Sequence, residues 1–298
     1  MFLSRSGAIF VICIFFVCFV FNSALENPYC RLDCDYVVKF FKHTVCERQN
    51  EKCSAGPLCG PDFRVVKLTD ADRQYILDIH NYLRNKVALG YEKRNNQPPA
   101  ANMNIMTYNM ELEYIAQCWA NACNGNPLNH DQCRRTSEYS HVGQNLGFIY
   151  SSISEINIVK ALKQLILIWY DEVALFKNEW INSTEDRNGI KVGHYTQMLW
   201  ADTIEIGCAT TYYTTPSDKN LTNVDLWHNL LLVCNYGPGG NYIGAPLYEI
   251  GRPTSNCPKG TKRNEKFKGL CGKSKHVKSS RKLFEIGDLA VSLNQLFV

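Results

Sequence analysis

The sequence predicts an α+β domain in which helices precede a hairpin of two strands, and three observations support that class. Apolar residues recur at helical spacing in three stretches, and two apolar strands follow them. Twelve cysteines follow an N-terminal apolar segment, an even number that is typical of exported, disulfide-linked proteins. Because the predicted helices and strands do not alternate, we expect a mixed, layered arrangement rather than βαβ units.

Residues 1–24 are predicted to form a secretory signal peptide. Arg5 precedes an apolar run over residues 8–21, which is shorter than the roughly 20 apolar residues of a membrane span. A retained signal anchor is the alternative, since Asn22 is not ideal for cleavage. We therefore expect a secreted, extracellular protein.

The cysteines of the mature chain are expected to form disulfides. They are Cys30, Cys34, Cys46, Cys53, Cys59, Cys118, Cys123, Cys133, Cys208, Cys234, Cys257 and Cys271. A structural zinc site is the alternative, but the spacings C-x3-C and C-x5-C are not CxxC pairs and export disfavours thiolates. Glycosylation sequons at Asn182 and Asn220 fit the same compartment and should lie on exposed loops.

Composition changes along the chain indicate four segments after the signal peptide. Residues 25–65 form a cysteine-rich extension with little periodicity. The main domain is expected over residues 66–250, followed by a loop closed by two cysteines over residues 251–272. A basic and amphipathic tail occupies residues 273–298.

Three helices are predicted within the main domain. The first begins at a capping box formed by Thr69 and Asp72 and ends at Gly90, and His80 lies on its buried stripe. A packed core histidine is the ordinary interpretation of His80, with a ligand as the alternative. The second helix begins near Asn109.

The third helix is predicted over residues 155–176 and carries Glu172 beside its inward apolar face. A carboxylate next to an apolar stripe needs a partner. A short strand is expected before this helix, over residues 143–149, and no internal repeat is visible.

Two polar stretches close the domain. GHYTQMLW at residues 193–200 is predicted to form a short helical turn that points His194 into a cleft. Strands over residues 204–213 and 226–236 should lie side by side, bridged by Cys208 and Cys234. The polar loops that flank these strands are then at one rim of the sheet.

His130, Glu172 and His194 are the candidate cleft residues. Two imidazoles and a carboxylate can bind a divalent metal such as zinc, can transfer protons, or can form a structural hydrogen-bonded cluster. The sequence has no HExxH helix, no GxSxG elbow and no Walker glycine loop. Every mature cysteine has a disulfide role, which removes the usual nucleophile.

The stretches GHYTQMLWA and LLVCNYGPGGNY closely resemble the two signature motifs of the CAP superfamily, which comprises cysteine-rich secretory, antigen 5 and plant pathogenesis-related class one proteins. YCRLDC, PLCG, HNYLRNKVALG and QPPAANM narrow the resemblance to the antigen 5-related branch of insect venoms and saliva. The motif residues, besides the cleft histidine, are Gly193, Tyr195, Thr196, Gln197, Asn235, Tyr236, Gly237 and Pro238.

The resemblance implies a three-layer α-β-α sandwich and a cleft tetrad. It assigns His130, Glu172 and His194 to three of the four positions. The usual GEN of the family reads GQN here, so Gln144 stands at the fourth position. Because an amide carries no charge and is a poorer ligand than a carboxylate, a divalent metal should bind weakly and a mechanism that needs two carboxylates is disfavoured.

The cysteine pattern of the family also implies disulfides. It suggests the pairs Cys30–Cys46, Cys34–Cys133, Cys59–Cys123 and Cys208–Cys234. Cys257 and Cys271 would close a local loop, and we predict that Cys53 and Cys118, which remain, pair with each other.

We expect a non-enzymatic extracellular binding or effector protein, monomeric, that needs no cofactor. A lipid or small ligand carried between the apolar faces of the first and third helices is one form of this function. A metal-assisted hydrolase or protease using His130, Glu172 and His194 is the alternative.

The tail holds ten Lys and Arg against one acid between Lys259 and Lys282. It is either a solvated tail or a contact for glycosaminoglycan or an anionic surface, and we expect no nucleic-acid partner.

Overall fold

The computed structural model describes residues 27–36, 39–50, 52–123, 127–183, 189–216 and 226–277. The predicted signal peptide, the Asn220 sequon and the amphipathic end of the tail lie outside these residues. None of the helices in the described ranges is long and apolar enough to cross a membrane.

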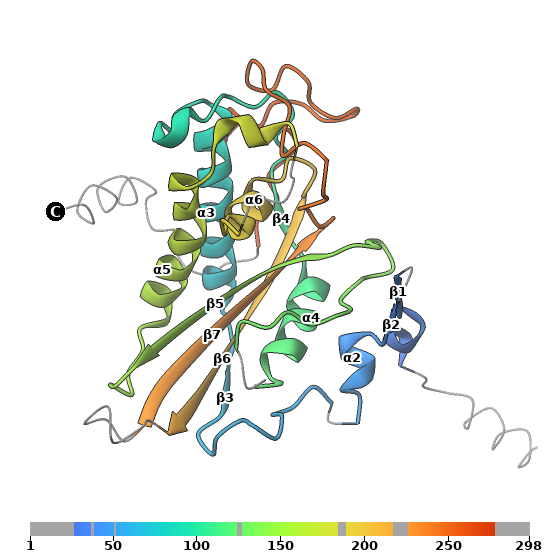
Figure 1. Cartoon of the computed structure of the whole chain (residues 1–298), viewed down its shortest axis with the longest axis vertical. Helices are drawn as coiled ribbons and strands as arrows, with labels where there is room; N and C mark the ends of the chain where they lie inside the picture. The colour runs from blue at the N-terminus through green and yellow to red at the C-terminus, as the bar shows by residue number, and fades with distance from the viewer. Residues whose placement is uncertain are drawn as a thin grey trace, which may run out of the picture.

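A five-stranded sheet forms the middle of the molecule (Figure 1). The order β3-β6-β7-β5 is antiparallel throughout, and β4 pairs with β6 in parallel. Cys208 lies opposite Cys234 in the β6–β7 register, so the predicted strand pair is confirmed, with each strand longer than expected. The strands are β3 (Arg64–Val66), β4 (Thr107–Tyr108), β5 (Gly143–Ser151), β6 (Glu205–Pro216) and β7 (Leu226–Gly237).

Helices cover both faces of this sheet, which confirms the three-layer α-β-α sandwich (Figure 1). The helices α3, α5 and α6 lie on one face and α4 lies on the other. These helices are α3 (Asp70–Ala88), α4 (Met110–Ala120), α5 (Ile158–Asp171) and α6 (Gly193–Leu199). Short 3-10 turns occur at η2 (Arg94–Asn96), η3 (Glu172–Ala174) and η4 (Asn178–Ile181).

The N-terminal extension is built from small elements tied to the outer side of α4. They are η1 (Pro28–Arg31), β1 (Cys34–Tyr36), β2 (Lys39–Phe41) and α2 (Thr44–Glu47). Two disulfides, Cys53–Cys118 and Cys59–Cys123, hold the extension against α4 and the residues that follow it. The extension is therefore cross-linked to the sandwich rather than packed as a separate core.

Among the described residues the structure contains six disulfides, and their pairs are those expected from the sequence. They are Cys30–Cys46, Cys34–Cys133, Cys53–Cys118, Cys59–Cys123, Cys208–Cys234 and Cys257–Cys271. Every cysteine in the described part of the chain is thereby oxidised.

The predicted first and second helices are confirmed, but the third is shorter than predicted. Thr69 and Asp72 form the capping box of α3, and Asn109 caps α4. The helix α5 begins only after Asn157, because the Asn157 side chain accepts a hydrogen bond from the Lys160 amide and so caps the helix. At its other end the chain tightens into η3, which begins at Glu172.

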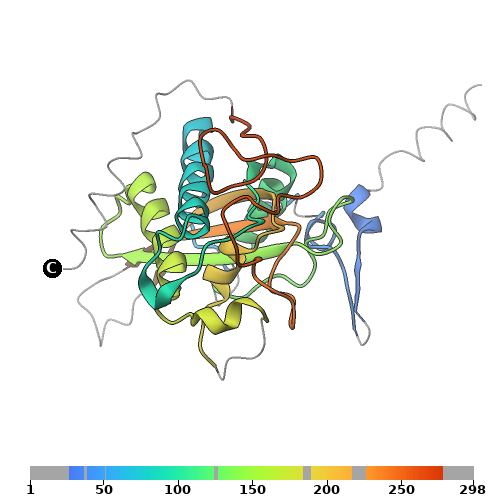
Figure 2. The ribbon, with the colours of Figure 1, turned by 90° about the horizontal axis from the view of Figure 1, so that it is seen from above.

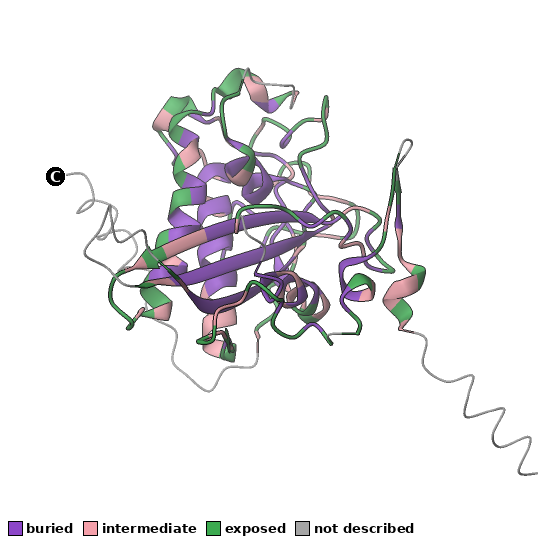
Figure 3. Cartoon of the chain, turned by 60° about the horizontal axis from the view of Figure 1, so that its bottom comes forward, coloured by how far each residue is buried: buried purple, intermediate pink, exposed green. Residues whose placement is uncertain are grey.

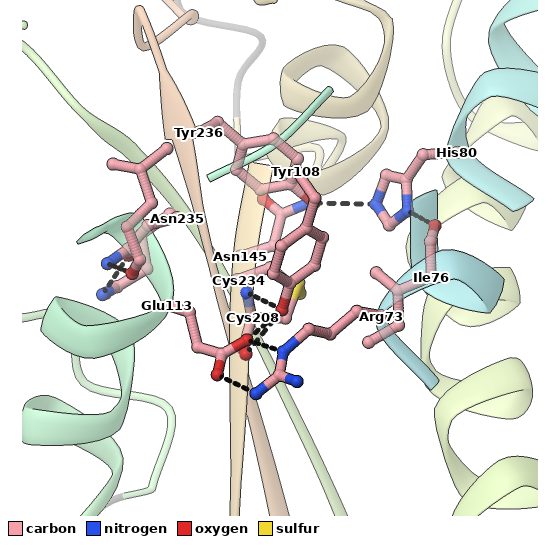
Figure 4. Close-up of a disulfide and its surroundings, with 12 residues drawn as sticks. Arg73, Ile76, His80, Tyr108, Glu113, Asn145, Cys208, Cys234, Asn235 and Tyr236 are labelled. Atoms are coloured by element: carbon pink, nitrogen blue, oxygen red, sulfur yellow. Dashed lines mark hydrogen bonds and ion pairs between the residues drawn. A yellow bond between two sulfur atoms is a disulfide. The ribbon is translucent and has the colours of Figure 1, made fainter. Parts of the chain in front are cut away.

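The strands β6 and β7 are buried over most of their length, as the purple ribbon of Figure 3 shows. The main core lies between these strands and the helices α3, α5 and α6. His80 belongs to it, as predicted: it is fully buried, and its ring bonds the Ile76 carbonyl and the Tyr236 hydroxyl beside the Cys208–Cys234 disulfide (Figure 4). Burial lowers the pKa of His80 to about 4, so it is a neutral packing residue at pH 7.

The segment after the sheet runs back along α3 (Figure 2). Phe267 and Leu270 are buried in the main core, although the sequence around them is rich in lysine. The loop that was expected to follow the domain is thus part of its packing.

Candidate functional site

A pocket of about 420 Å³ opens at the rim of the sheet, where α6 and β5 meet. It brings together the four residues selected from the sequence, His130, Gln144, Glu172 and His194. The remaining lining residues are Asn145, Ile190, Lys191, Val192, Gly193 and Asn241.

His194 is positioned by Glu172 at the beginning of α6. The Glu172 Oε1 atom accepts a hydrogen bond from His194 Nδ1 at 2.6 Å, and Oε2 accepts the backbone N–H groups of His194 and Tyr195, each at 3.0 Å. The first N–H groups of a helix have no partner within the helix and favour a negative charge. The carboxylate therefore caps the helix and orients the imidazole at once.

The other end of α6 is held by Arg84, which is fully buried. Its guanidinium donates to the carbonyls of Met198 at 2.8 Å and Trp200 at 2.7 Å, and also to carbonyls of residues 104, 201 and 203. Burial lowers the pKa of Arg84 to about 9, so it stays charged at neutral pH. A positive charge at a helix C-terminus is stabilising, and α6 is thus fixed from both ends.

His130 comes from a loop and is positioned by an amide instead. His130 Nδ1 lies 2.8 Å from Gln144 Oε1. The Gln144 amide group donates to Asn235 Oδ1 at 3.0 Å, and Asn235 donates to the Leu112 carbonyl at 3.2 Å. This chain of donors assigns the Gln144 oxygen to the histidine. Burial lowers the pKa of His130 below 6.5, which keeps its ring neutral at pH 7.

The two imidazoles share one tautomer. Since both Gln144 Oε1 and the Glu172 carboxylate are acceptors, each histidine donates from Nδ1, and Nε2 is the ring nitrogen that remains to bind a ligand. Among the described residues, neither Nε2 atom has a hydrogen-bond partner. Both rings line the same pocket, so the pocket holds two oriented nitrogen donors.

The donor set suits a metal only in part. No group of three or more His, Cys, Asp or Glu side chains among the described residues is arranged to hold a metal ion. Zinc sites in proteins use three or four protein ligands, and a partner that orients a ligating imidazole through Nδ1 is usual. His130 and His194 could therefore supply two ligands, while Glu172 orients one of them and water completes the shell.

Most residues of the two signature motifs support the site without lining it. Tyr195, Thr196 and Gln197 are buried, and Gln197 Oε1 accepts the Gly240 amide at 2.9 Å. A Cβ atom at position 143 would lie only 1.9 Å from Gln197 Oε1, which accounts for the glycine there. Tyr236 bonds His80 within the core, and Gly237 and Pro238 lead out of β7.

Five lining residues were not singled out from the sequence, and three of them are polar. Asn145 donates to the His194 carbonyl at 3.1 Å and to the Tyr236 hydroxyl at 3.3 Å. Asn241 donates to the Gly193 carbonyl at 3.0 Å, and Lys191 is an exposed cation at the pocket wall. The GQN triplet was a usable signal for Asn145, whereas nothing in the local sequence marks Lys191.

Comparison with known sequences identifies relatives over most of the chain. The profile described as "Cysteine-rich secretory protein family" matches residues 77–236. Venom allergen 3 of Solenopsis invicta is 41% identical over 213 residues, which is 70% of this chain and 83% of the relative. Venom allergen 5.02 of Dolichovespula maculata is 41% identical over 227 residues, covering 75% of this chain and 94% of the relative.

Solved structures with the same fold were also found. The crystal structure of NaASP2 with Zn²⁺ aligns with a TM-score of 0.51 and 32% identity, over 72% of this chain and 100% of that one. The structure of BmVAL-1 aligns with a TM-score of 0.55 and 28% identity, over 72% of this chain and 98% of that one.

Proposed function

The chain belongs to the cysteine-rich secretory protein (CAP) family, in its antigen 5 branch, and from this premise we propose that it is a secreted binding protein with a weak divalent-metal site in its cleft. Secretion is supported by six disulfides, which persist in oxidising compartments, and by the likeness to venom allergens. The exposed Asn182 fits a glycosylated surface loop.

One observation supports the metal site above the others: both histidines line one pocket, an acceptor holds each Nδ1 atom, and no described residue bonds either Nε2 atom. Imidazole nitrogen is a preferred ligand of zinc and copper. The solved relative NaASP2 was crystallised with Zn²⁺. With only two protein ligands and Gln144 at the fourth position, affinity should be low.

The same geometry disfavours the hydrolase alternative. The Glu172 carboxylate accepts three hydrogen bonds with its two oxygens, so it is committed to positioning rather than to abstracting a proton. Among the described lining residues there is no serine, threonine, cysteine or tyrosine that could act as a nucleophile. Gln144 is an amide and cannot act as a general acid or base at neutral pH. A bound metal would supply Lewis acidity, but it would occupy both imidazoles, and Lys191 is the one titratable described lining residue that would then remain besides Glu172.

The lipid-carrier form of the function finds less support. Leu83 and Val87 of α3 and Leu162 and Ile166 of α5 are completely buried in the main core. Their apolar faces are thus already occupied by the sheet and by each other. We therefore place ligand binding in the polar pocket rather than between the helices.

The metal site is tested by isothermal titration of the secreted protein with ZnCl₂ at pH 7.5. Variants His130→Ala and His194→Ala should each weaken zinc binding by at least about tenfold, because each removes one of two ligands. The control is His276→Ala, which removes an exposed histidine outside the pocket. Equal affinity in all four proteins would reject the site.

The hydrolase alternative is tested with the same variants on ester and peptide substrates. The binding function predicts no turnover that depends on His194. A loss of activity of at least about 10²-fold in His194→Ala, with the fold intact by circular dichroism, would favour the enzyme instead.

A further inference from the structure

We propose that the C-terminal segment 252–277, called here the basic loop, is a docking surface for a sulfated glycosaminoglycan. The segment holds eight Lys and Arg residues and a single acid, Glu265, which is a net charge of +7. The whole chain carries only +4, so the remainder is slightly acidic. The charge is thus concentrated in one short stretch, which contains none of the residues that line the cleft.

The basic loop has a defined shape. The Cys257–Cys271 disulfide closes it, and the Gly272 amide donates to the Lys262 carbonyl at 2.8 Å, which pairs the two sides of a hairpin. Asn264 Oδ1 accepts the amides of the two residues at the tip, 266 and 267, at 2.9 and 2.8 Å. A rigid display of charge loses less entropy on binding than a mobile tail does.

The apolar side of the basic loop faces the protein. Phe267 and Leu270 are buried in the main core. The Gly269 amide donates to Asn85 Oδ1 on α3 at 2.7 Å, and Lys266 pairs with Asp78 of the same helix at 3.2 Å. The loop is thereby fixed along α3, and its other side faces solvent (Figure 2).

The solvent side is cationic, and Glu265 is the one acid of the basic loop that is exposed there. Lys266 is the one cation of the basic loop that has an ion pair within the described residues. The Arg263 Nε atom donates to the Lys268 carbonyl at 2.8 Å. The Gly272 amide donates to the Lys262 carbonyl, and Lys273 is the next residue in the chain. These cations therefore lie around one hairpin. Seven further cations are exposed in this part of the chain: Arg252, Lys259, Lys262, Arg263, Lys268, Lys273 and Lys275.

A sulfated polysaccharide fits this surface better than other polyanions do. Each cation that meets an anionic group releases counterions, so affinity grows with the number of charges and falls steeply with salt. A membrane-binding loop would present apolar side chains for insertion, but Phe267 and Leu270 point inward. A single-strand nucleic-acid site would present aromatic rings for stacking, and the basic loop has no aromatic residue besides Phe267.

The test measures binding of the full chain to immobilised heparin over a range of salt concentrations. The triple variant Lys262→Ala, Lys268→Ala, Lys273→Ala should bind at least about tenfold more weakly, with a shallower dependence on salt. The matched control Lys42→Ala, Lys67→Ala, Lys160→Ala removes the same charge from exposed sites elsewhere and should change affinity less than about twofold.

Each other outcome decides against the proposal. If both triple variants bound heparin equally weakly, the net charge of the protein and not the basic loop would determine affinity. If the variant Lys262→Ala, Lys268→Ala, Lys273→Ala bound heparin as the parent protein does, the contact would have to lie beyond residue 277. Binding to phosphatidylserine vesicles without binding to heparin would indicate a membrane instead. Lys→Arg substitutions at the same three positions keep the charge and must retain heparin binding even if the alanine variant is poorly folded. Zinc titration of these variants should be unchanged, which separates this surface from the cleft.

Discussion

The two histidines of the pocket are held by different partners. His194 is bonded to a carboxylate and His130 to an amide, and we call these two units the acidic arm and the amide arm. In the acidic arm, Glu172 joins His194 to the beginning of a helix through three hydrogen bonds. In the amide arm, Gln144 joins His130, on a loop, to Asn235 on the neighbouring strand. The acidic arm combines ring orientation with helix capping, whereas the amide arm only orients the ring. The acidic arm should therefore matter for folding, and the amide arm chiefly for affinity.

Removing the carboxylate of the acidic arm should have the largest effect. We expect Glu172→Ala to lower the free energy of unfolding by about 2 kcal/mol, because hydrogen bonds to a charged group and the cap of α6 are lost together. Urea denaturation measures this change. Glu179→Ala, which removes an exposed carboxylate with one surface ion pair, should change stability by less than about 0.5 kcal/mol. A similar small effect for both variants would mean that the two arms do not differ as described.

Converting the amide arm into a second acidic arm should have the next largest effect. Gln144→Glu places a carboxylate beside His130 and should raise zinc affinity about tenfold, or about 1.4 kcal/mol, because a charged partner makes the imidazole a stronger ligand. Titration calorimetry measures it. Gln132→Glu adds the same charge near the His130 backbone without contacting the ring and is the control. No gain in Gln144→Glu would refute the role given to the amide.

Asn145 connects the two arms, since it follows Gln144 in β5 and donates to the His194 carbonyl. Asn145→Ala should reduce stability by about 1 kcal/mol, the value of a buried hydrogen bond. Thermal unfolding followed by circular dichroism measures this loss. If the arms were independent of Asn145, zinc binding by the variant would stay unchanged; we expect it to weaken.

The smallest expected effect is the response of the amide arm to pH. Because burial lowers the pKa of His130 below 6.5, the unfolded chain binds this proton more readily than the folded one. The stability that depends on a neutral His130 is present above pH 6.5 and is lost as the pH falls through its lowered pKa. His130→Gln should therefore lose less stability between pH 7.5 and 5 than the parent protein. The urea midpoint of unfolding is measured for both proteins between pH 7.5 and 5. An equal decrease of the midpoint in the two proteins would contradict the prediction.

Local signals in the sequence were sufficient for the elements that depend on local chemistry. The capping box of α3 needs only Thr69 and Asp72, and the β6–β7 pair follows from two apolar strands and a family cysteine pattern. The predicted end of α5 at residue 176 was wrong. The α-helix changes to a 3-10 turn at Glu172, whose carboxylate contacts α6, an element that lies later in the chain. For the same reason the Glu172–His194 bond could be expected only through a resemblance.

The docking of the basic loop on α3 was beyond sequence reasoning. Phe267 and Leu270 lie among lysines, so their stretch has the composition of a solvated tail. The segment that holds them is fixed by hydrogen bonds from Gly269 and Lys266 to Asn85 and Asp78, polar side chains of α3 that lie more than 180 residues earlier. From its composition alone, a segment with many exposed charges and a few buried apolar residues is predicted to be a solvated tail. Its packing becomes visible only when the helix that it contacts is known.

The buried Arg84 has a consequence for how this protein can vary. Its planar fork gathers carbonyl groups from two separate stretches, around residue 104 and over residues 198–203. A lysine has three donors on a flexible stem and could not satisfy the same oxygens. The position should thus admit arginine alone, and an exchange for lysine would pull apart the turn that follows the cleft helix while leaving every pocket residue unaltered.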